Sequence, residues 1–410
     1  MKGYMQLERE TAARHGGTAR EVFAAFLKLG LTSFGGPIAH LGYFHRELVA
    51  KRGWVSEAQY GQLLALCQFL PGPSSSQVGF ALGLIRAGWL GALAAFVAFT
   101  LPSAALLLAF ASAADYLSGT YGQATIHGLK LVAVAVVADG VRRMAKQLTP
   151  DAPRALIAAG AAAIVLTTRL PVMQLVVVAG GAIAGQWLCR HLPRLEGASF
   201  FPRFGPRLGT ALLAVFAVLL VLALVLAESR SGPMLANASA GFYRAGALVF
   251  GGGHVVLPLL QQTVVQPGWV TTDEFLAGYG AAQAVPGPMF TLSAFLGARL
   301  DDGSGGALGA SVCLLAIMLP GLLLVAGSLP WWSAIGRHPH ATRALAGVNA
   351  AVVGLLVAAL YQPVWTSAVQ SAWDFATALV AFVLLASTRV STLWSVAWCI
   401  VASIVRVSFA

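Results

Sequence analysis

Three serines that follow a Pro-Gly-Pro sequence are the first residues whose types and spacing indicate a chemistry. Ser74, Ser75 and Ser76 come directly after Pro73, and a proline there suits the start of a helix. A helix start offers free backbone N–H groups and a partial positive charge of about +0.5, which together bind anions. Hydroxyls on the first turn can cap the helix or donate hydrogen bonds to a bound oxyanion. The pattern therefore predicts an anion site, with N-capping as the alternative role of each serine.

Glycine-rich breaks at four places along the chain would create further helix starts of this kind. If a break lies within a membrane, its unpaired N–H and C=O groups must face protein or a wet cavity, because lipid cannot satisfy them. Four converging helix starts would sum to roughly two positive charges, which matches a dianion. The glycines and prolines expected at this site are Gly35, Gly36, Pro37, Gly72, Pro73, Gly251, Gly252, Gly253 and Gly287.

Two basic residues stand at equivalent places before these breaks. Lys28 lies six residues before Phe34, and Arg244 lies six residues before Phe250. A cation in the middle of a membrane costs at least about 2.5–3.5 kcal/mol and is functional by default, so we predict that both bind the anion. The alternative is that each side chain reaches to the membrane surface. Arg can hold an oxyanion through two parallel hydrogen bonds, whereas Lys acts as a point charge.

Further polar residues flank the breaks. Gln68 and Gln283 precede the two Pro-Gly-Pro regions, and their amides could donate to a substrate or bond a freed backbone carbonyl. His40 and His254 follow the first break of each half and are candidates for a proton relay, with packed or loop histidines as the alternative. The four cysteines occur singly, so we predict neither a disulfide nor a metal site, and we expect no cofactor.

Two polar features have simpler interpretations. Asp139 stands one turn before Arg142 and Arg143, which predicts an ion pair on the surface of a helix. Asn349 corresponds to Ala133 in the other half of the chain, and packing is its simplest role.

Composition restricts the class of protein that carries this chemistry. Of the 410 residues, 58% are apolar and only 10% are charged, against about 25% charged in soluble domains. A soluble protein could not cover this much apolar surface, which excludes an ordinary cytosolic enzyme, a disordered chain and a nucleic-acid binder. Uncharged runs such as 87–114 and 303–336 exceed the roughly 20 residues of a membrane-spanning helix. We therefore expect an all-α integral membrane protein, in which the cations behind the net charge of +11 lie between apolar runs and serve as orientation signals.

The chain is duplicated at a spacing of 215 residues. Gly-Trp-Val at 53–55 recurs at 268–270, and Pro-Gly-Pro at 71–73 recurs at 286–288. Ordered Gly and Pro residues at one fixed spacing indicate an internal repeat. In each half, the Gly-Trp-Val is followed by a pattern that predicts a capping box at the start of the next helix. The capping residues are Ser56 with Gln59 and Thr271 with Glu274.

The distribution of Lys and Arg predicts that the two repeats have opposite orientations. With the N-terminus in the cytoplasm, the basic stretches 46–52, 142–154 and 190–207 fall inside. An extra span at 208–227 turns the second repeat over, so that the turn 266–274, with two acids and no cation, falls outside. We expect two inverted repeats with broken helical hairpins, joined by this extra spanning helix, as in secondary transporters. Parallel repeats are the alternative if 208–227 lies along the membrane.

These features predict the following division of the chain. The expected parts are a cytoplasmic tail at 1–19, a first transmembrane repeat at 20–190, a basic linker with the extra span at 191–230, and a second transmembrane repeat at 231–410. The first repeat is expected to have four full crossings, at roughly 88–113, 122–143, 154–169 and 171–189.

A set of ordered motifs covers nearly the whole chain from about residue 20. Phe-Gly-Gly-Pro at 34–37, Gly-Trp-Val at 53–55 and Pro-Gly-Pro at 71–73 recur around Gly251 and Trp269 and at 286–288. In these motifs the chain resembles the long, two-domain members of the chromate ion transporter family. The resemblance implies an inner-membrane protein of bacteria or archaea that exports chromate and confers chromate resistance, driven by the proton gradient or by anion exchange. The second repeat departs from the pattern because it lacks the proline, which puts an equal contribution from both halves in doubt.

Alternatives to chromate export stay open at this point. Chromate resembles sulfate in size and charge, so a sulfate or general oxyanion carrier is one alternative, and an anion channel is another. The chain has no HExxH, GxSxG or paired intramembrane carboxylates to indicate an enzyme, and no GxxxxGK[ST] loop to indicate an ATP-driven pump. The expected partners are chromate or sulfate as substrate, the lipid bilayer and, as an open question, a second copy in a homodimer. No nucleic acid is expected.

Overall fold

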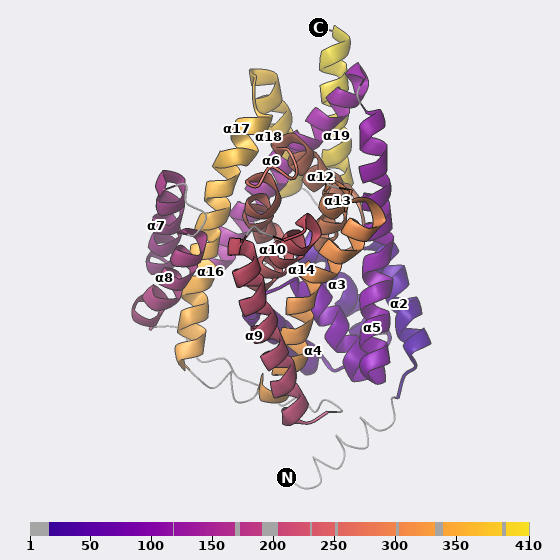
Figure 1. The fold of residues 1–410 in the computed structure, drawn as a ribbon, viewed down its shortest axis with the longest axis vertical. Coiled ribbons are helices and arrows are strands. Elements are labelled where there is room, and N and C mark those ends of the chain that lie inside the picture. The colour runs from indigo at the N-terminus through magenta and orange to yellow at the C-terminus, as the bar shows by residue number, and fades with distance from the viewer. Residues whose placement is uncertain are drawn as a thin grey trace.

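The computed structural model describes residues 16–117, 119–168, 173–190, 204–229, 232–250, 253–300, 303–332, 339–387 and 391–409. Every regular element in these ranges is helical, and most of the long helices run along the long axis of the molecule (Figure 1). The prediction of an all-α integral membrane protein is confirmed. The helices long and apolar enough to cross a membrane are Ser74–Ala113, Thr120–Leu148, Pro206–Leu226, Gly306–Trp331, His340–Ala368 and Thr392–Phe409.

The first repeat contains two broken segments followed by long helices. Its elements are α2 (Ala19–Thr32), α3 (Gly36–Phe44), a π-helical segment (His45–Lys51), α4 (Glu57–Phe69), α5 (Ser74–Ala113), a 3₁₀ turn (Ala114–Tyr116), α6 (Thr120–Leu148), α7 (Ala152–Thr168) and α8 (Met173–Leu188). Non-helical backbone at Ala87 and Gly88 divides α5 into a short and a long part. The short part ends beside the start of α2, where the Gly17 N–H donates to the Arg86 carbonyl at 3.3 Å.

The second repeat follows the same order with more interruptions. Its elements are α10 (Met234–Leu248), a 3₁₀ turn (Gly253–Val255), α11 (Val256–Leu260), a π-helical segment (Gln261–Val265), α12 (Thr272–Ala284), a 3₁₀ turn (Met289–Thr291), α13 (Leu292–Ala298), α14 (Gly306–Ser328), a 3₁₀ turn (Leu329–Trp331), α16 (Pro339–Ala359), a π-helical segment (Leu360–Trp365), α17 (Thr366–Ala368), α18 (Ala372–Ser387) and α19 (Thr392–Phe409). Before it, α9 (Pro206–Ser229) contains the extra span expected at 208–227.

Both predicted capping boxes are confirmed. At the start of α4, the Gln59 N–H donates to Ser56 Oγ at 3.2 Å, and the Ser56 N–H donates to the Gln59 side chain at 2.9 Å. At the start of α12, Thr271 and Glu274 exchange the equivalent hydrogen bonds at 3.2 and 3.1 Å. Each box satisfies two N–H groups that a helix start would otherwise leave unpaired.

The two Gly-Trp-Val turns lie at opposite ends of the long part of α5. Trp54 in the first turn packs against the Arg86 guanidinium, whose central carbon is 5.5 Å from the ring centroid. Glu274, which follows the second turn, binds Arg299 at 2.7 Å, and Arg299 also donates to the Ala111 carbonyl at 3.5 Å. Because Arg86 and Ala111 are separated by the long part of α5, about 37 Å of helix stands between the turns. The repeats are therefore inverted, as predicted.

The repeats exchange equivalent hydrogen bonds at their breaks. The Gly72 N–H donates to the Val249 carbonyl at 2.7 Å, and the Gly287 N–H donates to the Ser33 carbonyl at 2.9 Å. Gly72 corresponds to Gly287 in the repeat, and Ser33 corresponds to Val249. Each Pro-Gly-Pro break thus satisfies a backbone carbonyl freed by the other repeat's first break, so the two broken regions meet inside the molecule.

Helices α7 and α8 lie where the crossings at 154–169 and 171–189 were expected. They have 17 and 16 residues, below the roughly 20 that a span requires. The two helices lie side by side against α16 (Figure 1). Glycines make this packing close: a Cβ on Gly185 would come 2.3 Å from the Arg343 carbonyl oxygen, and a Cβ on Gly354 would come 2.2 Å from that of Ala158.

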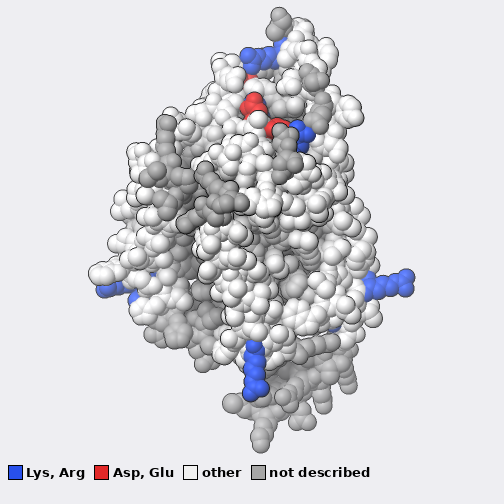
Figure 2. Space-filling model, in the orientation of Figure 1, with Lys and Arg blue, Asp and Glu red and all other residues white. Residues whose placement is uncertain are grey.

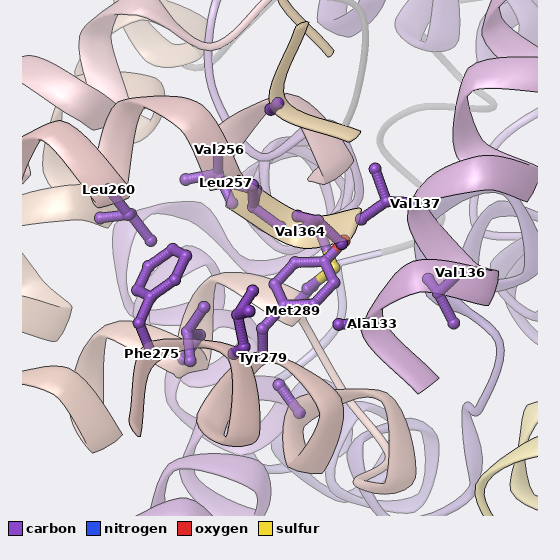
Figure 3. Packing of buried hydrophobic residues seen from close by; sticks show 14 of the residues in the cluster. Ala133, Val136, Val137, Val256, Leu257, Leu260, Phe275, Tyr279, Met289 and Val364 are labelled. Carbon is purple, nitrogen blue, oxygen red and sulfur yellow. The ribbon is translucent and has the colours of Figure 1, made fainter. Parts of the chain in front are cut away.

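The largest apolar core joins α6 of the first repeat to the second repeat. Val137 of α6, Leu257 of α11, and Phe275 and Tyr279 of α12 belong to this fully buried cluster (Figure 3). A separate core packs α2 to α5 against α14. On the face drawn in Figure 2, a broad band above the middle shows no charged side chain among the described residues, as a surface in contact with lipid requires. This buried packing holds α6, the helix that carries Arg143, in a fixed position.

Candidate functional site

A cavity of about 250 Å³ lies where the broken segments meet α6 and α16. It can hold one small anion together with several waters, since a water takes up about 30 Å³. Both repeats build its wall, because α16 and Gly253 belong to the second half of the chain. The lining includes polar residues, glycines and a proline from the broken segments, α6 and α16: Gly35, Pro37, Gln68, Gly72, Ser74, Gly140, Arg143, Gln147, Gly253 and Asn349.

Two helix starts of the first repeat face this cavity. Gly35 and Pro37 at the start of α3 line it, and so do Gly72 and Ser74 at the start of α5. Neither helix has a side-chain cap on its first N–H groups. Because the first turn of a helix has no internal acceptors for these groups, they are available to an anion. Gly36 and Pro73 stand between these lining residues in the chain.

The serines after Pro73 separate into one lining residue and two buried ones. Ser74 lines the cavity, whereas Ser75 and Ser76 do not belong to the lining set. Ser75 Oγ lies 3.4 Å from His40 Nδ1, and Ser76 Oγ is buried without a described hydrogen-bond partner. The expected alternative, a serine side chain that caps α5, does not occur at this helix start.

The fourth break contributes no lining residue, which differs from the expected convergence of all four. The Gly287 N–H is bonded to the Ser33 carbonyl. Gln283 is buried and donates a hydrogen bond to the Met289 sulfur at 3.0 Å. Its counterpart Gln68 is exposed and lines the cavity. The physical reason is that Met289 and Phe290 occupy the places that Ser74 and Ser75 have in the first repeat, and both pack into the apolar core.

The first break of the second repeat is described only in part. Gly253 lines the cavity, while Gly251 and Gly252 lie outside the described residues, as does the side chain of His254. His40 is fully buried, and its ring stands edge-on to Phe99 at 5.4 Å. Its Nε2 atom has no described hydrogen-bond partner.

The structure places Lys28 and Arg244 outside the set of lining residues. Lys28 Nζ lies 3.0 Å from Glu47 Oε2, and its side chain is 55% exposed. Arg52 and Lys51 bind the same carboxylate at 3.0 and 3.6 Å. Arg244 is half-buried on α10, and no ion pair is described for it. Roles of these two cations in anion binding stay predictions.

Glu47 is the acidic centre of the cluster that holds Lys28. Burial raises the pKa of the Glu47 carboxyl, but hydrogen bonds from Lys28 and Arg52, together with the charges of Lys28 and Lys51, outweigh burial and hold it below its ordinary value. The cluster is therefore ionised at neutral pH and ties α2 to the π-helical segment His45–Lys51.

Sequence reasoning missed three polar residues of the cavity. Arg143, Gln147 and Asn349 all line it, and the amide oxygen of Asn349 is buried without a described partner. The ion pair of Asp139 with Arg142 and Arg143 was predicted and is confirmed at 2.7 and 2.6 Å. The sequence offered no signal that Arg143 also faces a cavity, because this depends on how α6 packs against the second repeat.

Comparisons with known proteins agree with this architecture. A family model described as "Chromate transporter" matches residues 20–186 and again residues 236–404. The chain belongs to the chromate transporter family. The two matches cover both halves of the chain and confirm the resemblance of the sequence motifs. No solved structure matches the chain significantly.

Curated relatives are similar over most of their length. A "Chromate transport protein" of Cupriavidus metallidurans is 30% identical over 90% of this chain and 87% of its own. A "Probable chromate transport protein" of Synechococcus elongatus is 28% identical over 82% of each chain. A "Chromate transport protein" of Pseudomonas aeruginosa is 28% identical over 82% of this chain and 79% of its own. All three relatives are named as chromate transport proteins.

Proposed function

We propose that this protein is a secondary transporter that carries chromate, a tetrahedral dianion, across the membrane. The observation that carries the proposal is the cavity between the repeats, where two uncapped helix starts, the Ser74 hydroxyl and the Arg143 guanidinium come together. Helix starts and arginine are the groups that bind tetrahedral oxyanions in proteins. The names of the relatives support chromate as the substrate.

The proposed direction is export from the cytoplasm across the inner membrane, with the N-terminus in the cytoplasm and chromate resistance as the result. The basic stretches 46–52 and 142–154 support this orientation, because cations gather on the cytoplasmic side of membrane proteins. The energy source is the proton gradient or exchange for another anion. His40 is the proposed proton carrier of the first repeat, and His254 that of the second.

A general oxyanion carrier or an anion channel is the second candidate. Backbone N–H groups, a hydroxyl, an amide and a guanidinium recognise charge and tetrahedral shape, and sulfate shares both with chromate. The donors that line this cavity therefore favour a dianion without favouring chromate over sulfate. A channel would carry current without coupling to a second gradient.

Uptake of chromate into inside-out membrane vesicles that contain this protein tests the proposal. We expect uptake that rises with an imposed proton gradient, or with a trapped counter-anion, and that excess sulfate slows without abolishing it. Uptake that sulfate abolishes would favour the general carrier, and uptake indifferent to every imposed gradient would favour the channel. Vesicles that take up chromate no faster than vesicles without the protein would overturn the proposal.

A further inference from the structure

Asp139 is a buried carboxylate directly behind the cavity wall. Its side chain is only 8% exposed, and each of its oxygens binds a different arginine. Arg142 lies 2.7 Å from Oδ1, and the Nε of Arg143 lies 2.6 Å from Oδ2. Of these three residues only Arg143 lines the cavity. Asp139 therefore reaches the cavity through Arg143.

The contacts of Arg143 leave part of its guanidinium available. One N–H faces Asp139, and a second donates to the Leu385 carbonyl on α18 at 3.3 Å. Arginine carries five N–H donors in a planar group, so the described contacts occupy two and leave others for an anion. The two fixed contacts hold the guanidinium in one position, which lowers the entropy lost when it binds a ligand.

The charge of this cluster is smaller than that of its arginines. One carboxylate and two guanidinium groups sum to one positive charge, whereas the arginines alone would present two. No Asp or Glu belongs to the described lining of the cavity. The carboxylate of Asp139 is thus a negative charge that contacts the cavity through one intervening side chain, Arg143.

We propose that Asp139 is a positioning residue that sets how tightly the cavity holds a dianion, because it both orients Arg143 and offsets part of its charge. The inference rests on the proposed function, in that the cavity must bind oxyanions. A transporter has to release its substrate on the far side of the membrane, so binding that is too tight slows turnover. By lowering the affinity of the cavity for the anion, Asp139 allows faster release of the substrate.

Coulomb's law makes the proposal quantitative, because the interaction energy scales with the product of the charges. Removing the charge of Asp139 strengthens binding of a doubly charged anion by twice the free energy gained by a singly charged one. Perchlorate and sulfate are suitable probes, since both are tetrahedral and they differ in charge. If Asp139→Asn tightens perchlorate binding about threefold, it tightens sulfate binding about tenfold.

The experiment is equilibrium binding of radiolabelled sulfate to the purified full-length protein, with unlabelled perchlorate as competitor. Asp139→Asn is expected to lower the Kd for sulfate about tenfold and that for perchlorate about threefold. Arg142→Gln leaves Asp139 with Arg143 as its single arginine partner, which removes the net positive charge, and is expected to raise both values by the same factors. Asp151→Asn, which breaks the ion pair to Arg154 outside the cavity, is the matched control and leaves both unchanged.

Transport kinetics provide a second measurement that a merely structural role would not move. Asp139→Asn is expected to lower both KM and kcat for sulfate, since tighter binding delays release, and Asp139→Glu is expected to restore both. Asp139→Asn and Arg142→Gln that shift affinity in the same direction, or that change the two anions by equal factors, would overturn the inference. Wild-type protein that binds neither of these anions and no chromate would instead overturn the proposed function.

Discussion

At the residue scale, the cavity depends on side chains whose partners lie far away in the sequence. Arg143 faces the cavity because α6 packs into the second repeat, and Asn349 approaches from the equivalent helix α16. Lys28 was expected at the anion site, yet it binds Glu47 on the π-helical segment His45–Lys51. Helix starts can be predicted from local residue types, whereas the partner of a long side chain follows from how the chain folds back.

Stability of the Lys28 cluster should depend on pH. The pKa of Glu47 in the folded protein lies below its unfolded value near 4.5, so the ionised carboxylate stabilises the fold at neutral pH. This contribution is lost as the pH falls from about 4.5 through the lowered folded pKa. Glu47→Gln is therefore expected to lower the Tm of the detergent-solubilised protein at pH 7, with the difference from wild type shrinking toward zero in acid.

The control for this prediction is Glu57→Gln. Glu57 is 72% exposed and pairs only with His45 among the described residues, and exposed pairs contribute little to stability. A loss of Tm from Glu47→Gln that stays the same at every pH would mean that the carboxylate charge of Glu47 does not stabilise the fold.

At the scale of elements, breaks and helix starts followed from the sequence because their causes are local. Glycine tolerates positive φ, proline suits a first turn, and Ser or Thr three residues before Gln or Glu makes a capping box. It was less predictable which of the four breaks would line the cavity. In the second repeat, Met289 stands where the first repeat has Ser74, and its apolar side chain fills the fourth break. The second repeat also lacks the proline that follows Gly-Gly in the first repeat.

Both Pro-Gly-Pro glycines should be sensitive to substitution, Gly72 more so than Gly287, because the neighbour of Gly72 is backbone whereas the Ser103 hydroxyl beside Gly287 can rotate away. Gly72 and Gly287 have φ of 122° and 107°, which L residues rarely adopt. An added Cβ would come 2.8 Å from Gly321 Cα in one case and 2.8 Å from Ser103 Oγ in the other. Gly72→Ala and Gly287→Ala are each expected to cost about 1–3 kcal/mol, measured as a lower Tm. In Gly61→Ala, a helical control with open space around the site, the Tm should stay constant or rise; equal Tm values for all three variants would contradict this account.

At the scale of the whole molecule, the inverted repeats place equivalent turns at opposite ends of the long part of α5. The first turn lies at the Arg86 end of α5 and the second near Ala111. Duplication and the distribution of charges made this predictable, because both can be read along the chain without knowing contacts. The close packing of α7 and α8 against α16 was not predicted, since it depends on which glycines meet which carbonyl groups in the folded chain.

Cysteine labelling tests this orientation in intact cells. In a variant without the four native cysteines, Lys51→Cys is expected to react with a membrane-impermeant thiol reagent only after the cells are opened. Gln266→Cys is expected to react from outside. Labelling of both positions from the same side would show that the repeats are parallel.

The central claim is that the cavity between the repeats is the path of the anion, and Arg143 tests it most directly. The measurement is uptake of labelled chromate by proteoliposomes that contain the purified protein. Arg143→Gln is expected to reduce uptake at least tenfold, since it removes the one described cation that lines the cavity, whereas Lys146→Gln on the exposed face of α6 should transport like wild type. Wild-type uptake in Arg143→Gln would contradict the account and place the anion path elsewhere in the molecule.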